Sequence, residues 1–103
     1  MPPLNNMTTA IFPGSFDPFT IGHYDIVMRG LTLFDQVIIG IGHNSSKQST
    51  FPLEERLQAI QEVFAHEPRV KVEMYQGLPI DFAIDHHAQC ILRGVRSMQD
   101  FEY

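Results

Sequence analysis

The chain has 103 residues, of which 44% are hydrophobic and 18% charged, and its formal net charge is −5. This length suffices for one domain, and the composition is typical of a soluble globular protein. Apolar runs fall short of the roughly 20 residues of a membrane-spanning helix. The largest basic group is the pair Arg93 and Arg96, which argues against a nucleic-acid partner. The single cysteine, Cys90, lies in an apolar run, so it is interpreted as a core residue of a cytoplasmic protein.

The hydrophobic pattern predicts alternating strands and helices. Residues 1–8 lack the features of a signal peptide and are interpreted as a loose extension before one domain, residues 9–103. Strands are predicted at residues 10–12, 37–41, 70–74 and 91–92, and helices at 21–33, 52–68, around 80–84 and from 97. Ile80, Ala83 and Ile84 mark the third helix. Residues 37–41 indicate a strand covered on both faces, and residues 70–74 a strand nearer an edge. The expected fold class is α/β, Rossmann-like and doubly wound, with a mostly parallel sheet and helices on both faces.

The segment Pro13–His23 joins the first predicted strand to the first predicted helix. It contains two prolines, two glycines, an aspartate and, where the helix begins, a histidine. Unpaired backbone N–H groups and the helix dipole favour phosphate at such a position. Gly14 and Gly22 are interpreted as leaving the backbone open to a ligand. We therefore predict a phosphate site in which the ring N–H of His23 binds oxygens that gain charge as a pentacoordinate phosphorus forms. The alternative is that His23 is a core residue whose ring nitrogens make hydrogen bonds within the protein.

Further polar residues follow the other predicted strands. In a parallel sheet the loops after the strands meet at the carboxyl edge, where ligands bind. Because cations are scarce in this chain, Arg93 and Arg96 are favoured as phosphate ligands. Lys47 fits a phosphate site and a plain surface position equally well. Asp17 either binds a metal or a ligand group, or accepts hydrogen bonds from the backbone of its own loop.

Other motifs are absent or weak. The sequence has no P-loop, and Gly40-Ile41-Gly42 lacks the third glycine of a dinucleotide fingerprint. The cluster Asp85-His86-His87 is interpreted as a solvated helix end, because adjacent helical residues diverge and do not converge on a metal. His43 and His66 are interpreted as exposed. No residue is assigned as a metal ligand.

Several segments resemble a known family. PGSFDPFTIGH is similar to the phosphate-binding signature of the nucleotidyltransferase superfamily, which carries [T/H]-x-G-H. SSKQSTFPLEER and ILRGVRSMQDFEY resemble bacterial phosphopantetheine adenylyltransferases, and the resemblance runs from Ala10 to Tyr103. It implies adenylyl transfer from ATP to 4'-phosphopantetheine, which gives dephospho-coenzyme A and pyrophosphate in coenzyme A synthesis. It also implies Mg²⁺, bound mainly through ATP, and a cytoplasmic hexamer.

The resemblance implies roles for individual residues. His23 would steady the triphosphate in the transition state, and Lys47 and Arg93 would grip the acceptor phosphate, so these three are the expected catalytic residues. The expected ATP-binding residues are Ser15, Phe16, His23, Gly94, Val95 and Arg96. The expected residues for the acceptor are Ser15, Lys47, Leu78, Pro79 and Arg93. Ser15 replaces the threonine often seen at its position in the family. No covalent nucleophile is implied, because the acceptor phosphate is already ionised.

The family's chains are longer than this one. The resemblance predicts that the C-terminal part of the domain is missing after Tyr103, including an acidic residue, a further strand and a Ser/Thr-rich loop that closes over the ATP phosphates. Two other functions stay open. One is nucleotidyl transfer to another acceptor such as nicotinate mononucleotide, against which the RGVR segment argues. The other is a truncated, noncatalytic fragment that binds phosphopantetheine.

Overall fold

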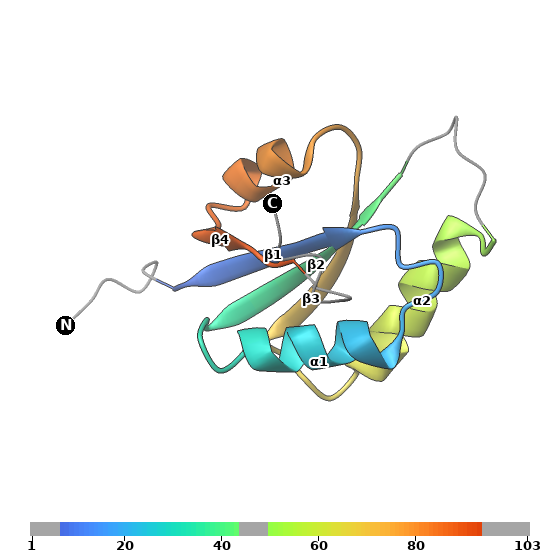
Figure 1. Cartoon of the computed structure of the whole chain (residues 1–103), viewed down its shortest axis with the longest axis horizontal. Helices are drawn as coiled ribbons and strands as arrows, with labels where there is room; N and C mark the ends of the chain where they lie inside the picture. The colour runs from blue at the N-terminus through green and yellow to red at the C-terminus, as the bar shows by residue number, and fades with distance from the viewer. Residues whose placement is uncertain (1–6, 44–49, 94–103) are drawn as a thin grey trace, which may run out of the picture.

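The computed structural model describes residues 7–43 and 50–93, and these residues form one α/β unit. Its four strands are parallel and lie in the order β3-β2-β1-β4. The strands are β1 (Thr9–Gly14), β2 (Gln36–Gly42), β3 (Val70–Tyr75) and β4 (Cys90–Ile91). The helices between them are α1 (Ile21–Gly30), α2 (Leu53–Val63) and α3 (Pro79–Asp85). Figure 1 shows α1 and α2 on one face of the sheet and α3 on the other. The predicted α/β fold is confirmed for this part of the chain.

The centre of the sheet is formed by β1 and β2, because both strands are apolar toward both faces. Residues 10–12 and 37–39 are each at most 4% exposed. Along β1, Ala10 and Phe12 pack in the cluster under α1 and α2, whereas Ile11 packs with residues of α3. The register pairs Ile11 with Ile38, which points to the same face. The two-sided cover predicted for residues 37–41 is confirmed, and β3 lies at an edge of the described sheet, as its alternating pattern predicted.

The residue just before β1 differs from the sequence prediction. Thr8, expected to be part of a loose extension, donates its amide N–H to the carboxylate of Asp35 at 2.9 Å and its hydroxyl at 3.0 Å. These two hydrogen bonds hold the pKa of Asp35 below its ordinary value. Residue 8 is therefore attached to the turn between α1 and β2.

Two helices end earlier than predicted. Helix α1 stops at Gly30 because the hydroxyl and the amide N–H of Thr32 both donate to the carbonyl of Arg29, which closes the last turn. Helix α2 stops at Val63, ahead of Pro68. None of the three described helices has the length and apolar character that crossing a membrane requires.

Helix α3 buries only part of the face expected. Of the three residues that mark it in the sequence, Ala83 is buried, whereas Ile80 and Ile84 are 51% and 62% exposed. Phe82 is buried in their place. The ring of Phe82 stacks on Tyr75 with centroids 4.7 Å apart. Gly40 makes room for this ring, since a Cβ at that position would lie 2.5 Å from Phe82 Cε2. A helix of seven residues has about two turns, too few for its apolar spacing to define one face.

Candidate active site at the carboxyl edge of the sheet

The loop between β1 and α1 lies at the carboxyl edge of the sheet. All described strands are parallel, so the chain leaves each of them at the same edge. The strand order reverses between β1 and β4, because β2 and β3 lie on one side of β1 and β4 lies on the other. Open α/β sheets bind ligands at such a switch point. In Figure 1 the chain runs from the tip of β1 through this loop to the start of α1.

Residues 15–20, called here the first loop, fold back over the end of β1. Phe16 has a positive φ of 49° and a side chain only 3% exposed, packed edge-on against Phe12 at a centroid distance of 5.1 Å. A Cβ on Gly14 would lie 2.9 Å from this ring. Gly14 is therefore required by the buried aromatic ring, a reason that the sequence did not indicate. At Gly22 the nearest atom to such a Cβ is Thr20 Oγ1 at 3.6 Å, so this position is open as expected.

His23 is fixed by the start of α1. The amide N–H of Thr20 donates to His23 Nδ1 at 2.9 Å, and the His23 amide N–H donates to Thr20 Oγ1 at 3.4 Å. This is a capping box in which histidine takes the place of the usual glutamate or glutamine. Because Nδ1 accepts a hydrogen bond, the neutral ring carries its proton on Nε2. The ring is thus a donor of fixed orientation, supported edge-on by Phe16 at 5.0 Å.

Partial burial lowers the pKa of His23 below 6.5, because the charged imidazolium loses solvation among the aromatic rings. We expect the ring to titrate below 6.5 when the ring protons are followed by NMR. Between the folded and the ordinary pKa the unfolded chain binds more protons, so His23 should stabilise the fold above pH 6.5 and lose that effect as pH falls through its folded pKa. A titration midpoint at or above 6.5 would contradict this.

Arg93 follows β4 directly and is exposed. The amide N–H of Leu92 donates to the carbonyl of Ile11 at 2.7 Å, so the chain still runs beside β1 when it reaches Arg93. The structure therefore brings His23, in the first turn of α1, and Arg93, after β4, to the same edge, on segments that follow neighbouring strands. Lys47, Gly94, Val95 and Arg96, and the helix predicted from residue 97, lie outside the described residues.

Four other residues predicted to contact the substrates have distinct environments. Ser15 is exposed, whereas Phe16 is buried as a whole and its ring packs against Phe12. Leu78 and Pro79 lie at the start of α3, after the β3 strand, and Leu78 is 61% exposed. They share the carboxyl edge with the first loop but are separated from it by β2 in the sheet order.

The carboxylate of Asp17 contacts a different loop from the one expected. It accepts the amide N–H groups of Thr50 and Phe51 at 2.6 and 2.7 Å. Arg56, which the sequence analysis did not single out, is 7% exposed and donates from Nη1 to the carbonyl of Ser15 at 2.6 Å. One sequence signal could have identified Arg56: it lies on the apolar face of α2, three residues after Leu53 and four before Ile60.

The histidines after α3 are only partly solvated. His87 is exposed as predicted, but His86 is half-buried, and its Nε2 lies 3.1 Å from a carboxylate oxygen of Glu73. Its ring is edge-on to Phe82 with centroids 4.7 Å apart. The interpretation as a solvated end is therefore wrong for His86. Across residues 7–43 and 50–93, no group of three or more His, Cys, Asp or Glu side chains is placed to hold a metal ion.

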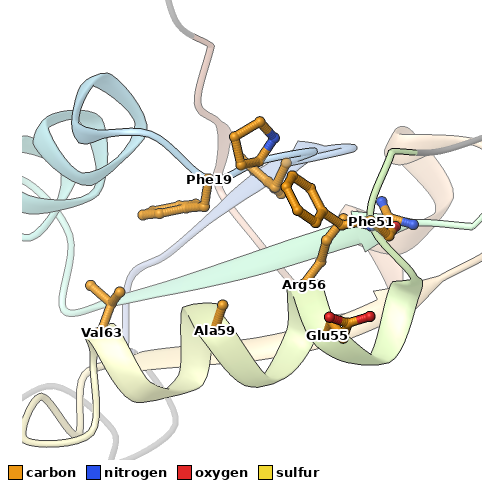
Figure 2. A pocket seen from close by; sticks show the side chains of 8 residues that line it. Phe19, Phe51, Glu55, Arg56, Ala59 and Val63 are labelled. Atoms are coloured by element: carbon orange, nitrogen blue, oxygen red, sulfur yellow. Dashed lines mark hydrogen bonds between the residues drawn. The ribbon is translucent and has the colours of Figure 1, made fainter.

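A pocket of about 330 Å³ lies between the first loop and α2. In Figure 2, Arg56, Ala59 and Val63 project from α2 toward the rings of Phe19 and Phe51. The lining is mostly apolar, and the guanidinium of Arg56 already binds main-chain carbonyls. The pocket therefore has the size of a small-molecule site but does not match the expected phosphate site.

Comparison with known proteins identifies the family. A family model described as cytidylyltransferase-like matches residues 11–103. The chain belongs to the cytidylyltransferase-like family. It is 57% identical over 97 residues to a phosphopantetheine adenylyltransferase of Phocaeicola vulgatus and 56% identical over the same length to one of Bacteroides fragilis. Both matches cover 94% of this chain, which spans 64% and 65% of the relatives' length. The predicted resemblance is thereby confirmed.

Several solved structures share the fold of this cytidylyltransferase-like chain. A NadR protein in complex with NAD and AMP-PNP has a TM-score of 0.65 and 25% identity, covering 79% of this chain and 27% of that one. A NadR protein in complex with NR has a TM-score of 0.66 and 26% identity, covering 82% and 26%. A lipopolysaccharide core biosynthesis protein from Thermoplasma volcanium, 19% identical with a TM-score of 0.63, covers 82% of this chain and 72% of that one and shows the fold alone.

Proposed function

We propose that the protein transfers the adenylyl group of ATP to 4'-phosphopantetheine and releases pyrophosphate. Support comes from the 57% and 56% identity to relatives named phosphopantetheine adenylyltransferase. The observation that carries the chemistry is the environment of His23. Its Nδ1 is held by Thr20, its Nε2–H is left as the donor, and both lie where a helix N-terminus favours phosphate.

The proposed reaction is an in-line displacement. An oxygen of the acceptor phosphate forms a bond to the α-phosphorus of ATP, and the bond from that phosphorus to the bridging oxygen of the β-phosphate breaks. The electron pair of the broken bond leaves with pyrophosphate. The Nε2–H of His23 donates to the phosphate oxygens that gain charge, and the N–H groups of the first turn of α1 add their dipoles. The neutral state favoured by burial leaves Nδ1 available to Thr20.

The remaining expected contacts complete the proposal. Arg93 and Lys47 bind the acceptor phosphate, and the Ser15 side chain and the Phe16 main chain contact ATP. Leu78 and Pro79 touch the pantetheine arm. Gly94, Val95 and Arg96 line the adenylate. With a net charge of −5, the chain has no general positive field, so these few placed groups must supply the phosphate affinity.

We also propose that Mg²⁺ enters with ATP. Within the described ranges no carboxylate or histidine cluster fits a protein-held metal, so ATP phosphates would provide the main ligands. Bound in this way, the ion would neutralise phosphate charge. A cytoplasmic location and a homo-oligomer, hexameric as the resemblance implies, belong to the same proposal.

The function is tested by measuring pyrophosphate release from the protein expressed from its complete reading frame. We expect release only when ATP and 4'-phosphopantetheine are both present. A panel that includes nicotinate and nicotinamide mononucleotides tests the acceptor, because two structures of similar fold are NadR complexes. Turnover of a mononucleotide in place of phosphopantetheine would contradict the proposal. Calorimetric binding of phosphopantetheine without turnover would instead identify a noncatalytic protein.

A further inference from the structure

Two loops that leave neighbouring strands are joined through the side chain of Asp17. This residue lies in the first loop, after β1, whereas Thr50 and Phe51 precede α2, on the connection that follows β2. One carboxylate oxygen accepts the amide N–H of Thr50 at 2.6 Å and the other accepts that of Phe51 at 2.7 Å. Because a carboxylate that accepts two amide donors is held in one orientation, Asp17 fixes the distance between the loops.

Arg56 joins the same two loops from the opposite direction. Its Nη1 donates to the carbonyl of Ser15 at 2.6 Å, and its Nε donates to the carbonyl of Phe51 at 3.0 Å. The side chain is 7% exposed, so these bonds are shielded from water. The planar guanidinium has donors in a fixed fork, which a lysine ammonium does not reproduce.

Together these contacts form a closed arrangement that we call the loop clamp: the side chains of Asp17 and Arg56 with the main chain of Ser15, Thr50 and Phe51. Phe51 is bound at both of its main-chain groups, its N–H by Asp17 and its carbonyl by Arg56. Ser15 and Asp17 are only two residues apart, so the clamp fixes a short stretch of the first loop at two points.

The clamp also sets the direction of one peptide group. The Ser15 carbonyl points to Arg56. In a planar trans peptide the C=O and the following N–H point in opposite directions, so the Phe16 N–H is turned away from Arg56. Because the Phe16 ring packs against Phe12 and His23, the contact of this residue with ATP is assigned to this N–H group.

We propose that Asp17 and Arg56 are positioning residues for nucleotide binding: through the loop clamp they turn the main-chain N–H of Phe16 toward the ATP phosphates. The inference rests on the proposed use of ATP. Neither residue needs to touch the substrate, since both act through main-chain groups of the clamp.

The test compares Arg56→Lys and Asp17→Asn with wild type, using the protein from its complete reading frame and a nonhydrolysable ATP analogue. Each variant is measured by calorimetry about 15 °C or more below its own Tm, so that the native state stays populated. We expect the Kd for the analogue to rise about tenfold in each variant, the scale of one misaligned charge-assisted hydrogen bond. In the double variant the rise should be smaller than the product of the two single effects, because both residues hold Phe51.

Arg29→Lys is the matched control, since Arg29 pairs with Asp25 on the exposed side of α1 and should leave the Kd unchanged. A lower Tm with an unchanged Kd in Arg56→Lys and Asp17→Asn would overturn the positioning role and leave a purely structural one. A wild type that does not bind the analogue would overturn it as well. Analogue binding without phosphopantetheine turnover would contradict only the proposed acceptor, so the two failures are distinguishable.

Discussion

Replacing His23 by alanine is expected to lower kcat for adenylyl transfer about 100-fold or more while the fold survives. The variant loses the Nε2–H donor that the capping box aims toward the phosphate site. It also loses one hydrogen bond to the helix start, for which a cost of about 1 kcal/mol of stability is typical. The measurement is pyrophosphate release at saturating ATP and phosphopantetheine, with circular dichroism to verify the fold.

A second substitution separates the chemistry of His23 from its capping role. Glutamine is a usual residue at the third position of a capping box, so His23→Gln should retain the cap on Thr20 and regain the stability lost in His23→Ala. Its kcat should still be low, because the imidazole is absent. His66→Ala, an exposed histidine after α2, is the control and should match wild type. An unchanged kcat in His23→Ala would remove this residue from the mechanism.

Replacing Arg93 by methionine is expected to lower kcat/KM for phosphopantetheine about 10- to 100-fold. The reason is the loss of a charge-assisted contact with the acceptor phosphate, for which about 1.5–3 kcal/mol is typical. Arg93 is exposed after β4, so the change should leave Tm nearly unchanged. Steady-state kinetics with phosphopantetheine as the varied substrate give the result.

The control for Arg93 is Arg69→Met. Arg69 is also exposed but precedes β3, at the opposite edge of the sheet, where it pairs with Glu67. It should not alter kcat/KM. Equal losses in both variants would indicate a general effect of net charge, and no loss in Arg93→Met would argue against acceptor binding by Arg93.

The sequence predicted the parts of the fold that depend on local pattern. Residues 37–41 are apolar without interruption, and the structure buries them between helices on both faces. The start of α1 at Ile21 was predicted from apolar spacing, although the cap formed by Thr20 and His23 was not. Helix ends were less predictable, since the end of α1 depends on the hydroxyl of Thr32, which leaves no periodic signal.

Interactions between residues far apart in sequence could not be read from pattern. The hydrogen bonds of Asp17 span 33 and 34 residues, and that between Arg56 and Ser15 spans 41. An aspartate in a turn usually bonds its own loop, which is why the local interpretation was reasonable for Asp17. Gly14 shows the same limit: only the folded position of the Phe16 ring shows why a side chain is excluded there.

The hydrogen bond between Thr20 and His23 Nδ1 couples the stability of the helix start to the charge that position 23 presents to a nucleotide. Selection could otherwise adjust these two properties separately. Glutamate at position 23 would retain the side-chain acceptor for this cap and suit the helix dipole, yet it would bring a negative charge against an incoming triphosphate. Alanine at this position would not repel the triphosphate, but it would destabilise the first turn of α1. A variant library scored once for thermal resistance and once for turnover should therefore rank substitutions at this position in different orders.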